Sequence, residues 1–217
     1  MVLKVKTKDG SFTLLNEEIN EHYHSMSGAE EEAMEKFAKP AIKSLKEKNN
    51  VENNIVVFDL FFGLGYKSAA FLDLLDLFKG NAEIICIEKD KAVIDEISSM
   101  NPRFNNYRII KEIAKSKEYK NERIKIKLIV GDVLEEIKKL DSKADIVFFD
   151  PFSPQKVPEL WNIEILSQIY KKMKSNGVLL TYSCAGKVRR TMKELNFSVI
   201  DGPVVGRRSP GTIAIKV

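Results

Sequence analysis

Cysteine and histidine are scarce in this chain of 217 residues, and long apolar runs are missing. Cys86 and Cys184 lie far apart and outside any CxxC pair, which argues against a disulfide framework or a thiolate metal site. The only histidines, His22 and His24, have no third ligand clustered with them, so we expect no bound metal. No stretch approaches the roughly 18 apolar residues that span a bilayer, and the N-terminus has no apolar signal core. We therefore expect a soluble, unexported protein of the cytoplasm.

The positive charge is gathered at the C-terminal end of the chain. Residues 151–217 contain eleven Lys or Arg against four Asp or Glu, although the whole chain has a formal net charge of only +4. Such an excess is typical of a surface that binds a polyanion, since Lys and Arg release counterions from phosphates. An ordinary solvated surface in a Lys-rich chain is the alternative.

The N-terminal residues have the pattern of a hairpin followed by a helix. VLKVKT and FTLL are separated by Asp9-Gly10, a pair that tolerates the backbone of a tight turn. Apolar residues then recur every fourth position between Ala29 and Lys48, which predicts one buried helical stripe. Pro40 lies inside this helix and is a candidate site for a kink.

From residue 55 onward, short apolar strands alternate with helical patterns. The strands are IVVFDL, EIICIE, KIKLIV, ADIVFFD and GVLLTYS, and the helices are expected near 66–78, 90–100, 133–140, 159–174 and 187–195. This alternation predicts a doubly wound α/β fold with a parallel sheet. FSVID and GTIAIKV follow without an intervening helix, so the sheet should end in an antiparallel pair. Residues 104–124 look like a charged excursion between strands.

This layout is similar to that of the class I S-adenosylmethionine-dependent methyltransferases. We therefore expect an α/β, Rossmann-like fold with a mostly parallel seven-stranded sheet, an antiparallel C-terminal strand and an N-terminal β-hairpin extension. A chain of this length suits one such domain with an N-terminal appendage.

Acidic residues or glycines stand at the ends of three successive strands. Asp59 precedes a loop with Gly63 and Gly65 that leads into a helix, where backbone N–H groups are free for a ligand. Glu88 ends the second strand, a position from which an acid can bind ribose hydroxyls. Asp132 follows the third and could receive an adenine amino group. The order of these signals favours S-adenosylmethionine, although the glycines could simply form a turn and Asp132 a helix N-cap.

A second signal is FFDPFSP, in which Asp150 ends an apolar strand and precedes two prolines. The prolines should stiffen the turn at the same sheet edge, where a substrate must meet the methyl group. A carboxylate at this place could hold an amine nucleophile and accept the proton shed on alkylation. The alternative is that Asp150 caps the turn at Ser153.

These segments resemble the MnmC-type tRNA methyltransferase family. The least generic pieces are DGSxTL with EHYHSxxGAxxE, and DxFSPxKxPELW with YSxAGxVRR. The resemblance spans nearly the whole chain and implies S-adenosylmethionine as donor and a tRNA wobble 5-aminomethyluridine, often 2-thiolated, as acceptor. The product would be 5-methylaminomethyluridine. We expect residues 1–28 to form the hairpin and the mouth of the cofactor site, and residues 29–217 the methyltransferase domain, without the flavin-dependent oxidase domain of longer members.

The resemblance assigns roles residue by residue. The expected cofactor-binding residues are Tyr23, His24, Ser25, Asp59, Gly63, Gly65, Glu88, Asp132 and Asp150, and the expected catalytic residues are Asp150, Phe152 and Ser153. Tyr23 and His24 should line the cofactor mouth or pack beneath it. Two positions depart from the family pattern. Phe61 replaces the first glycine of the loop, and Pro151 replaces a small residue, so that the turn reads DPF.

The basic C-terminal region supplies the expected RNA contacts. They are Tyr182, Lys187, Arg189, Arg190, Arg207 and Arg208. Tyr182 ends a strand and could contact an extruded base. The basic residues could bind phosphates or could form a solvated helix face.

Two other functions fit parts of the pattern. One is a small-amine methyltransferase or a spermidine synthase-like aminopropyltransferase, whose N-terminal hairpin and acidic strand ends are similar. The other is a noncatalytic RNA-binding module in which Phe61 has closed the cofactor pocket.

Overall fold

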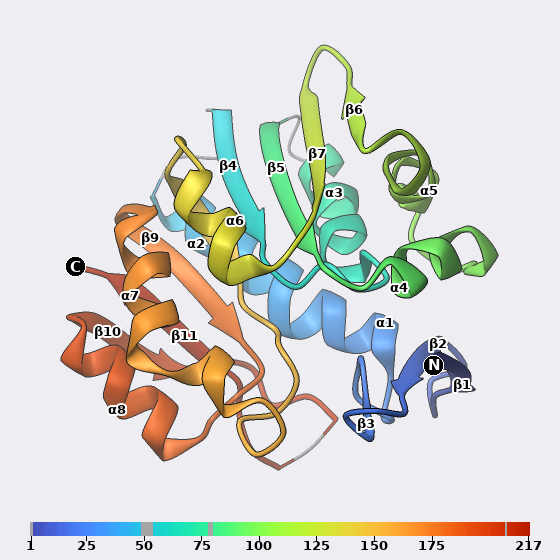
Figure 1. The fold of residues 1–217 in the computed structure, drawn as a ribbon. Coiled ribbons are helices and arrows are strands. Elements are labelled where there is room, and N and C mark those ends of the chain that lie inside the picture. The colour runs from blue at the N-terminus through green and yellow to red at the C-terminus, as the bar shows by residue number, and fades with distance from the viewer. Residues whose placement is uncertain (1, 49–53, 78–79, 207) are drawn as a thin grey trace.

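The computed structural model describes residues 2–48, 54–77, 80–206 and 208–217. Arg207, a predicted RNA contact, therefore lies outside the described residues. A mixed sheet runs through the molecule with helices on both faces (Figure 1). None of the helices in the described part of the chain has the length and apolar character needed to cross a bilayer.

Within the described residues, the main sheet has eight strands in the order β10-β11-β9-β8-β4-β5-β7-β6. Its strands are β4 (Asn54–Asp59), β5 (Asn81–Glu88), β6 (Glu118–Lys120), β7 (Ile124–Val130), β8 (Ala144–Phe148), β9 (Met173–Thr181), β10 (Phe197–Asp201) and β11 (Thr212–Lys216). The neighbours from β7 through β9 pair in parallel, whereas β11 is antiparallel to both β9 and β10. The predicted parallel sheet with an antiparallel C-terminal strand is confirmed.

The eighth strand and one helix come from residues 104–124, which the sequence pattern suggested were an irregular excursion. They form α5 (Tyr107–Ser116) and β6, which pairs antiparallel with β7. Ile109, Ile110 and Ile113 are buried on one side of α5, so the apolar spacing of a helix was present among the charged residues. The sheet therefore gains one edge strand beyond the seven expected.

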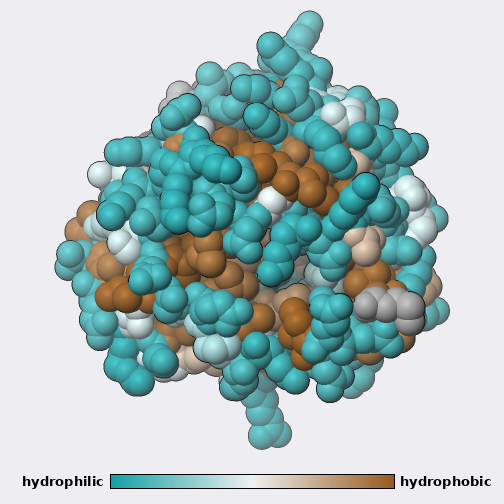
Figure 2. Space-filling view, in the orientation of Figure 1, coloured by the Kyte–Doolittle hydropathy of each residue, from teal (hydrophilic) through white to brown (hydrophobic). Residues whose placement is uncertain are grey.

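Helices pack on both faces of the sheet and enclose two hydrophobic clusters. One face carries α1 (Ala29–Glu32), the π-helical segment η1 (Ala33–Ala38), α2 (Lys39–Glu47), α3 (Tyr66–Leu77), α4 (Lys91–Glu96), the 3₁₀ turn η2 (Ile97–Ser99) and α5. The other carries α6 (Val133–Lys139), η3 (Pro158–Trp161), α7 (Ile163–Lys171) and α8 (Gly186–Glu194). Figure 2 shows a largely hydrophilic surface over these layers, interrupted by bands of hydrophobic residues.

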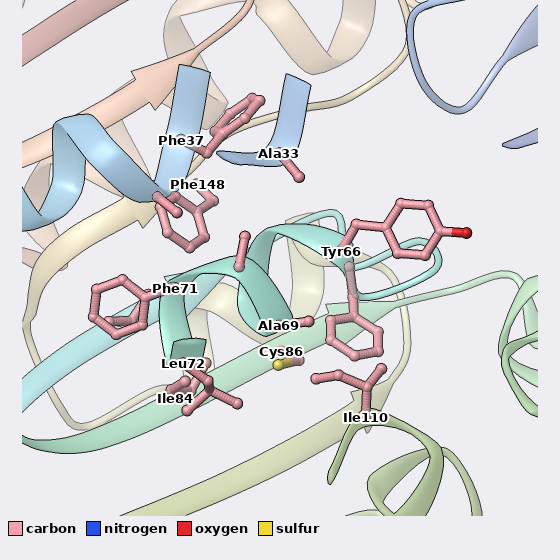
Figure 3. Packing of buried hydrophobic residues seen from close by; sticks show 14 of the residues in the cluster. Ala33, Phe37, Tyr66, Ala69, Phe71, Leu72, Ile84, Cys86, Ile110 and Phe148 are labelled. Carbon is pink, nitrogen blue, oxygen red and sulfur yellow. The ribbon is translucent and has the colours of Figure 1, made fainter. Parts of the chain in front are cut away.

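Aromatic side chains join the N-terminal helix to the sheet. Phe148 of β8 packs edge-on against Phe37 and Phe71, with ring centroids 5.9 and 6.1 Å apart (Figure 3). All three side chains are fully buried. The apolar stripe predicted for residues 29–48 therefore covers the end of β8, immediately before Asp150.

Pro40 does not end this helix. Proline lacks the N–H that would bond to the carbonyl four residues earlier, and the chain adopts a π-helical segment over Ala33–Ala38 directly before it. The N–H of Lys39 bonds to the carbonyl of Met34, five residues back. The helix thus continues through the proline, and the π-helical turn includes Lys36.

The N-terminal residues form a separate antiparallel sheet. It contains β1 (Val2–Lys6), β2 (Phe12–Asn16) and β3 (Glu21–His22), so the expected hairpin has a short third strand. The Tyr66 hydroxyl donates to the carbonyl of Phe12 at 3.0 Å and ties this sheet to α3. The division into residues 1–28 and 29–217 stays a prediction.

The loop from β4 to α3 makes its tightest approach at Gly65. Its φ is +73°, in the left-handed region, and a Cβ there would lie 2.5 Å from Ile110 Cγ2 and 2.7 Å from Phe62 Cζ. Both neighbours are buried. Glycine is therefore required for the backbone conformation and for the close packing of the loop.

We predict that Gly65→Ala lowers the free energy of unfolding by about 2–5 kcal/mol, because left-handed strain and overpacking add. Gly10→Ala is the matched control, since Gly10 also has a positive φ but no atom within 4 Å of the added Cβ. It should cost only about 1–2 kcal/mol. Urea unfolding followed by circular dichroism measures both. Equal losses in the two variants would contradict the packing argument.

Candidate functional site

A pocket of about 350 Å³ lies at the carboxyl ends of β4, β5 and β8 and beside the loop after β7. This volume is within the range of small-molecule sites, about 300–1,000 Å³. The N-terminal segment forms the opposite wall through residues between Asn16 and Met26. The strand ends identified in the sequence therefore meet at one pocket, as the rule for parallel sheets requires.

Glu88 is fixed at the end of β5 by two backbone donors. Its carboxylate accepts hydrogen bonds from the N–H of Gly63 at 2.8 Å and of Asp90 at 2.9 Å. Burial raises its pKa, and these two bonds oppose the rise. The carboxylate also lines the pocket, and each of its oxygens has a further lone pair for a ligand hydroxyl.

Asp132 has the capping role that the sequence allowed as an alternative. Its side chain accepts from the N–H of Leu134 at 2.8 Å and so begins α6. Asp132 also lines the pocket, with its carboxylate 4.0 Å from the ammonium of Lys89. Helix capping and ligand contact can therefore coexist at this residue.

Lys67, in the first turn of α3, is buried between the ends of β4 and β8. Its Nζ lies 2.8 Å from the carbonyl oxygen of Phe61, 3.2 Å from Asp150 Oδ2 and 3.6 Å from Asp59 Oδ1. The Lys67 side chain is only 3% exposed and that of Asp150 8%. One ammonium is thus shared by two buried carboxylates.

Burial raises the pKa of both carboxylates, Asp150 and Asp59. Burial raises the pKa of Asp150 to about 7 against the opposing effect of Lys67, and Glu32 adds to the rise. Burial likewise raises the pKa of Asp59 to about 6, although Lys67 and the Ser68 hydroxyl oppose it. Asp150 therefore changes protonation near neutral pH, where a group that takes and releases protons is most useful.

The loop after β8 is held from both sides. The N–H and hydroxyl of Ser153 donate to the carboxylate of Glu21, the hydroxyl at 2.7 Å from Oε2. The Trp161 indole N–H donates to the Phe152 carbonyl at 2.7 Å. Ser153 thus bonds to Glu21 and not to Asp150, so the carboxylate of Asp150 is left to face Lys67 and the pocket.

Tyr23 and His24 line the pocket from the N-terminal segment. The Tyr23 hydroxyl donates to Asp90 at 2.9 Å, and its ring packs edge-on against Phe152 with centroids 4.8 Å apart. His24 stacks on Tyr66 and pairs with Thr13. Burial, with the nearby charge of Lys67, lowers the pKa of His24 to about 3, so the ring is neutral.

Ser25 completes this wall beside a buried ion pair. Its N–H donates to the Glu32 carboxylate at 2.7 Å, and the other oxygen of Glu32 lies 2.7 Å from the ammonium of Lys36. All three residues line the pocket. Glu32 and Asp150 therefore approach the same space from different elements.

Several other expected site residues lie away from the pocket wall. Asp59 is fully buried beneath it and accepts from the Ser68 hydroxyl at 2.8 Å. Gly65 shapes the loop and Ser153 anchors the turn, whereas Gly63, Phe152 and Tyr182 line the pocket. Phe61 also lines it, with its ring packed edge-on against Phe149, and the pocket stays open.

The basic residues near the C-terminus have different surroundings. Lys187, Arg190 and Arg208 are exposed. Arg189 instead donates to Thr212 and to the carbonyl of Gly211, each at 2.8 Å, and pairs with Asp201 at 2.6 Å. These bonds hold its guanidinium against the start of β11. Its predicted phosphate contact, like the others, stays a prediction.

The sequence pattern did not single out several polar side chains of this site, among them Glu21, Lys36, Lys67 and Asp90. A lysine in a helix is usually solvated, so only the position of Lys67 two residues after Gly65 could have suggested burial. The buried charged side chains described around the pocket include more acids than lysines. The acids are Glu32, Asp59, Glu88 and Asp150, and the lysines are Lys36 and Lys67. Such a site favours a positively charged ligand.

Comparison with known proteins assigns the family. A family model described as S-adenosyl-L-methionine-dependent methyltransferase matches residues 96–217. The crystal structure of MnmC2 from Aquifex aeolicus superposes with a TM-score of 0.83 at 35% identity, covering 99% of this chain and 70% of that one.

Two curated relatives are longer than this chain. An uncharacterized protein of Methanocaldococcus jannaschii is 36% identical over 98% of this chain and 59% of its own length. The tRNA 5-methylaminomethyl-2-thiouridine biosynthesis bifunctional protein MnmC of Campylobacter hominis is 29% identical over 88% of this chain and 29% of its own length. With the fold and the strand-end acids, these matches make the chain an MnmC-type member of the S-adenosyl-L-methionine-dependent methyltransferase family.

Proposed function

We propose that this protein methylates the amino group of 5-aminomethyluridine, with or without a 2-thio group, at the wobble position of tRNA. The product would be 5-methylaminomethyluridine. The observation that carries the proposal is the buried carboxylate of Asp150, facing the pocket of a chain that is similar to MnmC2 over 99% of its length.

The pocket residues fit S-adenosylmethionine. The carboxylate of Glu88, already oriented by two N–H groups, is suited to the ribose hydroxyls, and Asp132 to the adenine amino group. Gly63 approaches this space without a side chain. The excess of buried acids suits a cofactor that carries a sulfonium and an ammonium. When bound, S-adenosylmethionine supplies an electrophilic methyl group on positively charged sulfur.

Asp150 has the surroundings of a residue that prepares an amine for methylation. An alkylammonium has no lone pair to offer, so the amine must lose a proton before it can act as a nucleophile. Asp150, whose pKa is raised by burial to about 7, can pair with the ammonium and accept that proton. The stiff turn, anchored by Glu21 at Ser153, would hold the carboxylate in place.

The remaining groups suit an RNA substrate. Tyr182 lines the pocket, where an extruded base could contact its ring. Lys187, Arg190 and Arg208 are exposed and can bind phosphates. Arg189 donates three of its five N–H groups to Asp201, Thr212 and Gly211, so two remain for a phosphate.

A direct test uses tRNA that carries 5-aminomethyluridine, together with labelled S-adenosylmethionine. We expect label in the tRNA, and none in the same tRNA with an unmodified wobble uridine. Free spermidine is offered in parallel, because an acidic pocket also suits a small polyamine. Turnover of spermidine without label in tRNA would favour the small-amine alternative. Cofactor binding without turnover of either substrate would favour a noncatalytic module.

Asp150→Asn should lower kcat for the tRNA about 10²–10⁴-fold, because the amide accepts no proton. Its affinity for S-adenosylmethionine should stay within about threefold of wild type, since the change is nearly isosteric. Single-turnover methyl transfer and calorimetry measure the two effects. Near-full activity of this variant would remove Asp150 from the mechanism.

Glu88→Gln should weaken S-adenosylmethionine binding about 10–100-fold, because hydrogen bonds to a charged acceptor are lost. Glu83→Gln is the matched control, since Glu83 lies on the same strand at the far end and pairs with Lys125. Its affinity should be unchanged. Calorimetry measures the affinity of both variants for S-adenosylmethionine, and equal affinities in Glu88→Gln and Glu83→Gln would contradict the role of Glu88.

Replacing Lys187 and Arg190 by Ala should weaken tRNA binding and reduce the slope of log K against log salt by about one per lost phosphate contact. Lys138 and Lys139 on α6 are the control pair, because both are paired with glutamates of their own helix. Their replacement should leave the slope unchanged. A filter-binding salt titration measures it, and identical slopes for both double variants would place the RNA elsewhere.

A further inference from the structure

Resting on the proposed function, we propose that Lys67 is a positioning residue that favours the ionised form of Asp150 and holds its carboxylate at the pocket, ready to receive the acceptor's ammonium group. Lys67 acts through Asp150 and does not itself need to touch a substrate. Lys67 also pairs with Asp59, whose negative charge opposes the effect of Lys67 on the pKa of Asp150.

Two hydrogen-bond acceptors and one ion-pair partner surround the ammonium of Lys67. Lys67 Nζ faces the Phe61 carbonyl at 2.8 Å, Asp150 Oδ2 at 3.2 Å and Asp59 Oδ1 at 3.6 Å. Phe61 lies in the loop after β4, Asp150 in the loop after β8, and Asp59 at the end of β4. A single side chain thus connects the cofactor loop to the proposed proton acceptor.

Neither burial nor helix position favours a lysine here. The whole Lys67 residue is only 2% exposed to solvent, and removing an ammonium from water is costly unless carboxylates surround it. It is also the second residue of α3, where the helix dipole favours anions over cations. Lys67 is therefore stabilised by the two acids that it contacts, and they in turn depend on it.

Charged groups on several elements surround this cluster. Glu32 of α1 and Asp59 of β4 raise the pKa of Asp150, whereas Lys67 lowers it. Glu88 of β5 raises the pKa of Lys67 and of Asp59.

Three further groups contribute little charge. His24 is neutral, because burial lowers its pKa to about 3. Cys86 is held as a thiol by burial, which raises its pKa. Lys36 is paired with Glu32 at 2.7 Å. Among the residues that the structure describes, Lys67 is thus the cation that contacts Asp150.

The proton transfer that this arrangement serves is balanced within the site. An N–H bond of the acceptor's ammonium breaks, an O–H bond forms on Asp150, and the electron pair stays on nitrogen. The step requires Asp150 to be ionised when the acceptor arrives. Removing the charge of Lys67 would leave the carboxylate protonated at neutral pH, with no place for the incoming proton.

The test compares the pH dependence of kcat/KM in Lys67→Met, Asp59→Asn and wild type. Loss of the cation raises the pKa of Asp150, so the acid limb of Lys67→Met should move up by at least about one pH unit. Activity at pH 7 should then fall about tenfold or more and recover as pH rises. Asp59→Asn removes a carboxylate that raises the pKa of Asp150, so its acid limb should move down. The acceptor's own pKa is common to all variants and cancels from the comparison.

Lys174→Met is the matched control, because Lys174 pairs with Asp145 at the other end of β8, at 2.7 Å. Its profile should coincide with that of wild type. Circular dichroism and calorimetry with S-adenosylmethionine check that each variant is folded and binds cofactor. Coincident profiles for folded Lys67→Met and wild type, or an upward move in Asp59→Asn, would overturn the proposal.

A second readout is independent of the acceptor. Carbon-13 NMR of protein labelled at the aspartate carboxyls follows the titration of Asp150 directly, with Asp150→Asn giving the assignment. Asp150 should titrate at higher pH in Lys67→Met and at lower pH in Asp59→Asn. If wild type does not methylate the tRNA, the proposed function fails while these titrations still decide the role of Lys67. If wild type is active and Asp150 titrates alike in all proteins, the inference alone fails.

Discussion

The ammonium of Lys67 joins the parts of the fold on which the site depends. It contacts the carbonyl of Phe61 after β4 and shares its charge between Asp59 and Asp150. Because the cluster is buried, both acids ionise less readily than in water, and the pKa of Asp150 is raised by burial to about 7. The ammonium that bonds to the β4–α3 loop also lowers the pKa of Asp150 against the effect of burial.

The N-terminal segment completes the pocket through contacts that are distant in sequence. Glu21 binds the backbone and hydroxyl of Ser153, 132 residues away, and Tyr23 binds Asp90. Glu32 receives the N–H of Ser25 and is paired with Lys36 on the π-helical turn before Pro40. The pocket wall contributed by the N-terminal part of the chain is thus built from residues near 21–26 and from Glu32 and Lys36. Movement of residues 17–38 would change both the shape of the pocket and the position of the turn that contains Ser153.

The sequence predicted those features that depend on local patterns. Alternating apolar strands and helices indicated the parallel sheet, and an acid or glycine at a strand end indicated the edge where Glu88, Asp132 and Asp150 meet. Tertiary contacts were beyond it. The burial of Lys67 depends on two acids from other strands, and nothing local separates Arg189, which is bonded to Asp201, from exposed Arg190. The charges of residues 104–124 concealed the apolar face of α5.

The central claim is that Asp150, the buried acid just after β8, accepts the proton from one amine on tRNA as that amine is methylated. Nucleoside mass spectrometry of tRNA treated with the protein and S-adenosylmethionine tests it most directly. The account predicts that 5-aminomethyluridine gains the mass of one methyl group, that fragmentation places this methyl on the side-chain nitrogen, and that other nucleosides are unchanged. A methyl group on a base ring or a ribose, with the aminomethyl group untouched, would contradict the account.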